Sequence, residues 1–231
     1  AFAAIPTRLE VEDAIFATLK ANGMSDGVHC RITLTRGMKS TSGMDPRLNV
    51  FGTTLIVLPE YKGMVYGDEG IRLVTSAIRR NNPAFLDSKI HHNNLLNNIL
   101  AKIEANVAGV DDALMLDGEG FIAETNATNV FAVRKGTLVT PTAVACLPGL
   151  TRQLVLELAR GANIPVEERR VSLTEFYTAE EVFTTGTMGG LAHVVEIDGR
   201  RIGASTGMGP VTKRLQDIYR TQSWEQAVPL R

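Results

Sequence analysis

The sequence predicts an α+β fold with two lobes, divided between residues 81 and 88. Amphipathic helical segments and short β-branched runs both occur, and the turns between them carry glycine, proline or polar residues. The composition is that of a globular protein, since 44% of the residues are hydrophobic and 21% are charged. With 231 residues, the chain is long enough for one large domain or two small ones. We therefore expect a small lobe over residues 1–85 and a large lobe over residues 86–231.

The small lobe is predicted to begin with a helix over residues 1–22. Val11, Ile15 and Leu19 recur at a spacing of four residues, acidic side chains stand near the start, and Gly23 is a plausible stop. Apolar, β-branched runs then predict strands at residues 29–35, 53–58 and 71–78. The stretch 36–47, rich in glycine and serine, is the expected loop between the first two strands.

The large lobe is predicted to begin with a helix over residues 94–106, in which Leu95, Ile99 and Ile103 share one face. Short strands are expected at residues 113–116, 121–124, 129–133 and 137–139. An amphipathic helix over residues 150–160 follows and ends at Gly161. Strands at 182–185 and 194–197, a hairpin turn at Asp198-Gly199 and a final helix over 210–220 complete the lobe.

Several classes of protein are not expected. No apolar run reaches about 18 residues, so no membrane span is predicted, and no secretory signal is visible. The net charge of −1 gives no reason to expect nucleic acid. Cys30 and Cys146 fit neither a disulfide framework nor a metal motif. We therefore expect a reduced, cytoplasmic protein. For the adjacent His91 and His92 we predict structural polar contacts and no metal.

Lys89 stands just before a predicted helix in a polar stretch. Most lysines are surface residues, and that is the ordinary interpretation. A desolvated lysine can instead form a Schiff base with an aldehyde cofactor. The residue alone leaves both possibilities open.

Three further segments carry candidate chemistry. Glu124 ends a predicted strand and is either a solvated edge residue or a carboxylate that keeps a pyridine nitrogen protonated. Pro148 and Gly149 directly precede a helix, whose free N–H groups and Thr151 hydroxyl can cradle a phosphate. Residues 184–190 offer more N–H and hydroxyl groups for an anion, although a hydroxyl-rich tight turn is the simpler explanation.

The order of these features along the chain is specific. Lys89 comes first, Glu124 follows with Asn129 five residues later, and Leu138-Val139-Thr140 and the segment 147–152 come after. This order resembles the signature of the class IV aminotransferases, which are pyridoxal-phosphate enzymes of fold type IV. The family includes branched-chain amino acid aminotransferase, D-amino acid aminotransferase and aminodeoxychorismate lyase. The resemblance covers almost the whole chain and implies a two-lobed fold type IV architecture whose large lobe binds pyridoxal 5'-phosphate.

The resemblance also implies roles for individual residues. Lys89 is the implied Schiff-base lysine and catalytic residue, Glu124 pairs with the pyridine nitrogen, and Leu147 packs on the cofactor ring. The other implied cofactor-binding residues are Gly149, Leu150, Thr151, Gly186 and Thr187. The implied substrate-binding residues are Arg36, Thr187, Met188 and Gly189. Of these, Arg36 matches the place of a carboxylate-binding arginine in D-amino acid aminotransferases, and a guanidinium suits a carboxylate.

The function implied is transfer of an amino group from a branched-chain amino acid to 2-oxoglutarate. The branched-chain subgroup is favoured because residues 73–83 and 209–214 resemble it most. A D-amino acid aminotransferase and an aminodeoxychorismate lyase remain open, and so does an inactive remnant or a structural partner in a dimer. A homodimer or higher homo-oligomer is expected from the resemblance, with amino acids and 2-oxo acids as the small-molecule partners.

The sequence departs from the family pattern in two places. Branched-chain enzymes often carry Asn-Tyr shortly after the lysine, with the tyrosine near the cofactor hydroxyl. This chain has His92-Asn93-Asn94-Leu95 instead, with an apparent extra residue and no tyrosine, which leaves a histidine or an asparagine as the substitute partner of the hydroxyl. Family members also have several dozen residues ahead of the point that matches Ala1, and these hold the first strands of the small lobe and a phosphate-binding arginine. We therefore expect that the small lobe is truncated at its N-terminal end.

Overall fold

The computed structural model describes residues 4–204 and 207–230, which form two compact units. The first unit is Ala1–Gly63 together with Val228–Arg231, and the second is Met64–Ala227. The predicted division at residue 85 differs from this one. Strand β3 (Ile71–Thr75) pairs with strands of the second unit, so the segment that follows residue 63 belongs to the larger unit.

The first unit is a helix packed on a two-stranded antiparallel hairpin. Helix α1 (Arg8–Ala21) packs against β2 (Thr54–Tyr61), which pairs with β1 (Val28–Thr35), and a short 3-10 helix, η1 (Pro46–Leu48), lies in the loop between the strands. The helix begins later than predicted because Thr7 and Glu10 form a capping box. The Thr7 backbone N–H donates to the Glu10 carboxylate at 2.6 Å, and the Glu10 N–H donates to the Thr7 hydroxyl at 3.3 Å. Residues 1–3 of the predicted helix lie outside the described residues.

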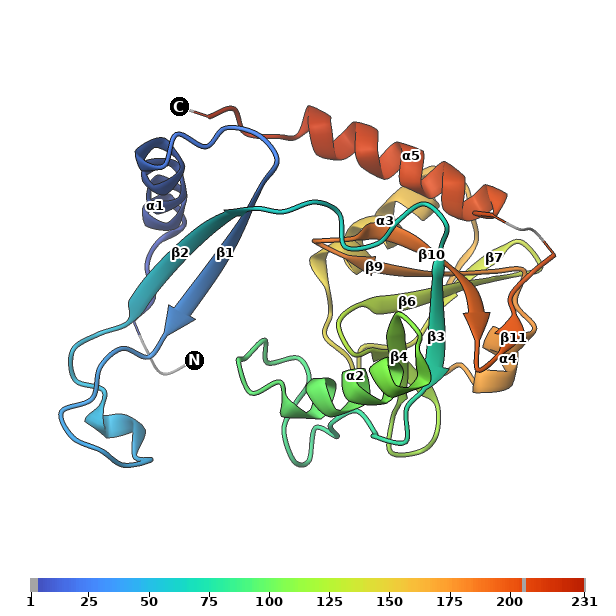
Figure 1. Ribbon diagram of the computed structural model, residues 1–231, viewed down its shortest axis with the longest axis horizontal. Coiled ribbons are helices and arrows are strands. Elements are labelled where there is room, and N and C mark those ends of the chain that lie inside the picture. The colour runs from blue at the N-terminus through green and yellow to red at the C-terminus, as the bar shows by residue number, and fades with distance from the viewer. Residues whose placement is uncertain (1–3, 205–206, 231) are drawn as a thin grey trace. The chain divides into compact units, whose positions relative to one another are not determined.

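The second unit is built on one mixed sheet (Figure 1). Its further strands are β4 (Asp112–Leu116), β5 (Ile122–Thr125), β6 (Asn129–Arg134), β7 (Thr137–Thr140), β8 (Val166–Glu168), β9 (Glu181–Gly186), β10 (Gly190–Ile197) and β11 (Arg200–Arg201). The order across the sheet is β5-β4-β3-β10-β9-β6-β7-β8, and β11 pairs with β10. Strand β3 runs parallel to β4 and β10, and β7 runs parallel to β8. The helices are α2 (Leu96–Ala108), α3 (Leu150–Gly161), α4 (Leu173–Tyr177) and α5 (Pro210–Glu225).

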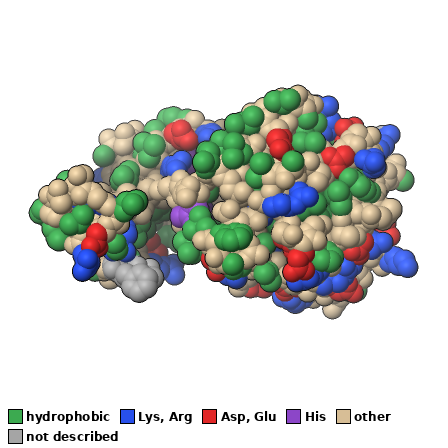
Figure 2. Space-filling model, turned by 90° about the horizontal axis from the view of Figure 1, so that it is seen from below, with side chains coloured by type: hydrophobic (Ala, Val, Ile, Leu, Met, Phe, Trp, Pro, Cys, Tyr) green, Lys and Arg blue, Asp and Glu red, His purple; other side chains and the backbone are tan. Residues whose placement is uncertain are grey.

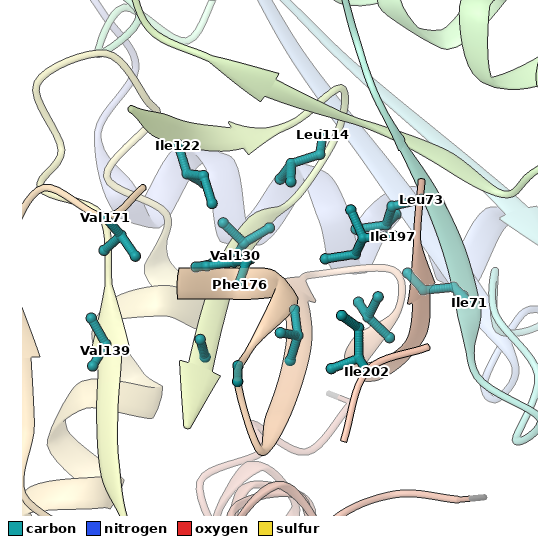
Figure 3. Close-up of a cluster of buried hydrophobic side chains, with 14 of the residues drawn as sticks. Ile71, Leu73, Leu114, Ile122, Val130, Val139, Val171, Phe176, Ile197 and Ile202 are labelled. Atoms are coloured by element: carbon teal, nitrogen blue, oxygen red, sulfur yellow. The ribbon is translucent and has the colours of Figure 1, made fainter. Parts of the chain in front are cut away.

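Buried aliphatic and aromatic side chains hold this unit together. One cluster joins residues of β3, β4, β6 and β10 to Phe176 of α4 (Figure 3). A second cluster packs α3 and α5 on the sheet around Phe131 and Phe183, whose rings stack with centroids 5.1 Å apart. Burial of this apolar surface is the main stabilising contribution to the unit. The result is a rigid sheet whose loops carry the candidate site.

Most predicted elements of the second unit are confirmed, with shifts of a few residues at their ends. Strand β8 and helix α4 were not predicted. The signal for α4 was present, because Ser172 and Glu175 form a capping box. Strand β10 begins at Gly190 rather than at residue 194, and its start was missed because Gly189 and Gly190 together are typical of a turn.

A buried carboxylate holds the start of α5 against the sheet. Glu181 of β9 accepts hydrogen bonds from the Val211 N–H at 3.0 Å, the Thr212 N–H at 2.8 Å and the Thr212 hydroxyl at 2.6 Å. A Cβ atom at Gly209 would lie 2.1 Å from the Glu181 carboxyl carbon, so the glycine leaves room for this contact. The segment 209–212 is therefore a structural anchor.

Among the helices that the structure describes, none combines the length and the apolar composition that a membrane span requires.

Candidate active site

A cavity of about 600 Å³ in the second unit collects nearly all of the predicted site residues. It is lined by Lys89, Glu124, Leu147, Gly149, Leu150, Thr151, Gly186, Thr187, Met188 and Gly189. A volume of this size is typical of small-molecule sites. Arg36 is the exception, because it follows β1 in the first unit, whereas the residues that line the cavity belong to the second. Its substrate-binding role stays a prediction.

Glu124 lies at the buried floor of the site. The residue is 4% exposed, and its Oε1 atom accepts a hydrogen bond from Arg80 Nε at 2.6 Å. Its Oε2 atom accepts from Asn129 Nδ2 at 3.1 Å and from the Leu147 N–H at 3.3 Å. Burial raises the pKa of Glu124 to about 7, and the attraction of the Arg80 guanidinium opposes that rise. The carboxyl group can therefore both hold and release a proton near neutral pH.

Arg80 is a site residue that the sequence did not predict. Its side chain is buried beside Glu124, and its Nη1 atom also donates to Asn97 Oδ1 at 3.2 Å. Neither its spacing from residue 124 nor its position in an Arg-Arg pair indicates a buried partner. The Arg80–Glu124 ion pair fixes the orientation of the carboxylate in the cavity.

Asn129 connects the carboxylate to the loop before α3. Its Nδ2 atom donates to the Leu147 carbonyl at 2.8 Å as well as to Glu124. A Cβ atom at Gly149 would lie 2.3 Å from Asn129 Oδ1, so a glycine is required there by lack of space. This contact explains why the candidate motif combines Glu124, Asn129 and Gly149.

The N-terminus of α3 faces the same cavity. Its N-cap residue, Gly149, supplies no side-chain hydrogen bond, and Leu150 at the first helical position is 84% exposed. Free N–H groups at a helix start bind anions well. Thr151, in the first turn of α3, and Thr187 also line this cavity. The buried Thr185 hydroxyl, in the same lining, finds no hydrogen-bond partner among the described residues. This end of the cavity fits a phosphate group.

Lys89 lies on the loop between β3 and α2. Its side chain is half-exposed, and its Nζ atom lies 3.6 Å from Asp87 Oδ1. Of the two histidines for which structural polar contacts are predicted, His92 makes one: its Nδ1 atom accepts a hydrogen bond from the Asn94 N–H at 3.1 Å. His91 instead lines the cavity with Lys89.

Tyr66 forms a wall between this cavity and a neighbouring one of about 410 Å³. Its hydroxyl donates to the buried Asp112, and burial raises the pKa of Tyr66 above its ordinary value. A Cβ atom at Gly189 would come within 2.7 Å of the Tyr66 ring. The role of Tyr66 is not evident from the sequence, because its only signal is a position in the segment that leads into β3.

An amine, a buried carboxyl group and an uncapped helix end thus share one cavity on a mixed sheet. Residues 3–197 match the family model described as amino-transferase class IV. The match covers most of the chain, and the chain belongs to the class IV aminotransferases. The predicted family is confirmed.

The most similar relatives include "Branched-chain-amino-acid aminotransferase-like protein 2" of Arabidopsis thaliana, 59% identical over all 231 residues. A putative branched-chain-amino-acid aminotransferase of Methanocaldococcus jannaschii is 37% identical over 215 residues, which is 93% of this chain and 73% of that protein. A solved T.th. branched-chain amino acid aminotransferase, complexed with N-(5'-phosphopyridoxyl)-L-glutamate, has a TM-score of 0.88 and 31% identity. The match covers 97% of this chain and 74% of that one, and it confirms the fold type IV architecture. The chain spans only 41% of the length of the plant relative.

Proposed function

We propose that this chain carries the cofactor site of a branched-chain amino acid aminotransferase that uses pyridoxal 5'-phosphate and 2-oxoglutarate. The observation that supports it most is the single cavity lined by Lys89, Glu124 and the N-terminus of α3. The cofactor has an aldehyde, a pyridine nitrogen and a phosphate, and these residues offer a chemical partner for each. Relatives named as branched-chain enzymes and a relative that holds a phosphopyridoxyl-glutamate adduct support the substrate pair.

When bound, pyridoxal phosphate supplies an aldehyde that joins the substrate amino group and a ring that draws electrons from the substrate Cα. Lys89 would take the proton from the substrate Cα and return it to the cofactor C4' atom. Glu124 would keep the ring nitrogen protonated by accepting a hydrogen bond from it. The first turn of α3 and Thr187 hold the phosphate, and Leu147 covers the ring.

The test is an amino-transfer assay on the chain loaded with pyridoxal phosphate. We expect L-leucine and 2-oxoglutarate to yield glutamate, and we expect Lys89→Ala to abolish the reaction. Preference for D-alanine would move the assignment to the D-amino acid aminotransferases and would support a substrate-binding role for Arg36. Release of pyruvate from aminodeoxychorismate would identify a lyase. A chain that never develops the cofactor's visible absorbance is an inactive remnant or a structural partner.

We also propose that two copies of this chain associate through α2. Residues at helical spacing on α2 expose apolar side chains, namely Leu96, Ile99, Leu100, Ile103 and Val107. The side of the molecule seen in Figure 2 carries groups of hydrophobic side chains between charged ones. An apolar stripe of this kind marks an interaction surface in a protein with an otherwise mixed surface.

The dimer proposal predicts the effect of a charge on this stripe. Ile103 is 50% exposed, so Ile103→Glu leaves the monomer core intact and disfavours association. Light scattering should give about 50 kDa for the unaltered chain, twice the 25.0 kDa of one copy, and about 25 kDa for the variant. Met44→Glu, at an exposed apolar residue of the first unit, is the control. Equal masses for all three proteins would refute the role of α2.

A further inference from the structure

His91 lines the cavity that contains Lys89 and Glu124, and the proposed amino transfer does not use it. Among the described residues, the titratable side chains that line this cavity are Tyr66, Lys89, His91 and Glu124. All but His91 have an ionisable partner, the pairs being Tyr66 with Asp112, Glu124 with Arg80 and Lys89 with Asp87. In the described part of the chain, the His91 ring makes no hydrogen bond and no ion pair. His91 is thus left available for a bound molecule.

The neighbouring histidine provides a direct comparison. His92 does not line the cavity, and its Nδ1 atom is already used by the Asn94 N–H at 3.1 Å. Two adjacent imidazoles therefore have different surroundings: one stabilises its own loop and the other faces the cavity. An imidazole that faces a ligand can donate one hydrogen bond and accept another.

The chemistry of the cofactor indicates what His91 would contact. On the pyridine ring, the carbon that bears the aldehyde stands opposite the nitrogen, between the carbon that bears the phosphate arm and the carbon that bears a hydroxyl. The proposed contacts give the nitrogen to Glu124, the aldehyde to Lys89 and the phosphate to α3. The hydroxyl, next to the aldehyde, remains without a partner. His91 stands two residues from Lys89 and lines the same cavity.

We infer that His91 donates a hydrogen bond to the ring hydroxyl oxygen of the bound cofactor, beside Lys89. This inference rests on the proposed function, because it requires pyridoxal phosphate in the cavity. A donated hydrogen bond stabilises the deprotonated oxygen, so that oxygen holds the proton it shares with the lysine nitrogen less firmly. The pKa of the lysine-linked cofactor is thereby lowered. His91 is a cofactor-contacting residue that also sets this protonation equilibrium.

The test follows the cofactor's visible absorbance across pH in the 231-residue chain loaded with pyridoxal phosphate. We expect His91→Phe to raise the pKa of the absorbance transition by about one pH unit, roughly a tenfold change. His92→Phe, which removes the same ring one residue away, should leave that pKa where it is. His91→Gln keeps a hydrogen-bond donor and should return the pKa toward the unaltered value.

The outcomes separate this inference from the proposed function. If the band forms and His91→Phe leaves its pKa unchanged, the inference is overturned while the cofactor site stands. If His91→Phe and His92→Phe raise the pKa equally, the effect comes from the loop, and the inference is again overturned. If the unaltered chain develops no visible band, the proposed function fails and His91 has no such role.

Discussion

At the scale of single residues, the contact between Asn129 and Gly149 ties the two ends of the cavity together. Because a Cβ atom at Gly149 would meet Asn129 Oδ1 at 2.3 Å, Gly149→Ala must displace either the asparagine or the helix start. We expect a loss of about 1–3 kcal/mol in the free energy of unfolding, measured by urea denaturation, together with weaker binding of pyridoxal phosphate.

Gly161, at the other end of α3, provides the control for that substitution. A Cβ atom there meets nothing within 4 Å, and its backbone angle φ is not positive. Gly161→Ala should leave the protein as stable as before or up to about 1 kcal/mol more stable. If both variants behaved alike, lack of space at Gly149 would not be the reason for its glycine.

Glu124 gives the protein a predictable dependence of stability on pH. Its folded pKa of about 7 lies above the ordinary value of 4.5, so the folded state binds more protons than the unfolded state between these values. The free energy of unfolding should therefore fall as pH rises through this window, by up to about 3 kcal/mol. Bound cofactor would offset the fall, because its protonated ring nitrogen would donate a hydrogen bond to the ionised carboxylate.

The measurement is urea denaturation of the cofactor-free chain at several pH values between about 4.5 and 7.5, the window in which Glu124 titrates. The double variant Arg80→Met/Glu124→Gln removes both charges without leaving one of them buried and unpaired. In the double variant, the free energy of unfolding should no longer show the part of its pH dependence that Glu124 contributes. A slope that is the same in both proteins would mean that another group causes it.

Residue type and order were enough to predict most of the candidate site. Lys89, Glu124 and the segment 147–152 are recognisable because their chemistry and their spacing are both distinctive. Arg80 escaped prediction for a different reason. Its role depends on which buried side chain it meets across the fold, and no local pattern encodes that.

At the scale of elements, α5 depends on a carboxylate from a neighbouring strand. Glu181→Gln removes the charge that accepts from the first turn of the helix and disturbs three hydrogen bonds. We expect a loss of about 1–3 kcal/mol in the free energy of unfolding. Glu157→Gln, on an exposed part of α3, should change it by less than about 0.5 kcal/mol. Equal effects would contradict an anchoring role for Glu181.

The elements themselves were largely predictable from periodicity, since each long helix and most strands carry a clear apolar pattern. The exceptions are short. Strand β8 has three residues and α4 has five, which is too little for a period to emerge. Only the capping box of α4 could have revealed it.

At the scale of the whole molecule, the predicted boundary between the lobes differs from the observed one because strand pairing is non-local. Strand β3 pairs with residues near 113 and 195, which its own sequence does not indicate. The chain spans 41% of the length of the plant relative, so most of that relative has no counterpart in these residues. The central question is therefore whether these 231 residues hold the cofactor by themselves.

The most direct measurement is to mix the chain with pyridoxal phosphate, reduce it with borohydride and locate the attached group by peptide mass mapping. We expect one phosphopyridoxyl group on the peptide that contains Lys89, and none there in Lys89→Ala. Glu124→Gln should retain the attachment and lose about 10²-fold or more in amino transfer. Attachment spread over surface lysines, or an unchanged attachment pattern in Lys89→Ala, would contradict a Schiff-base role for Lys89.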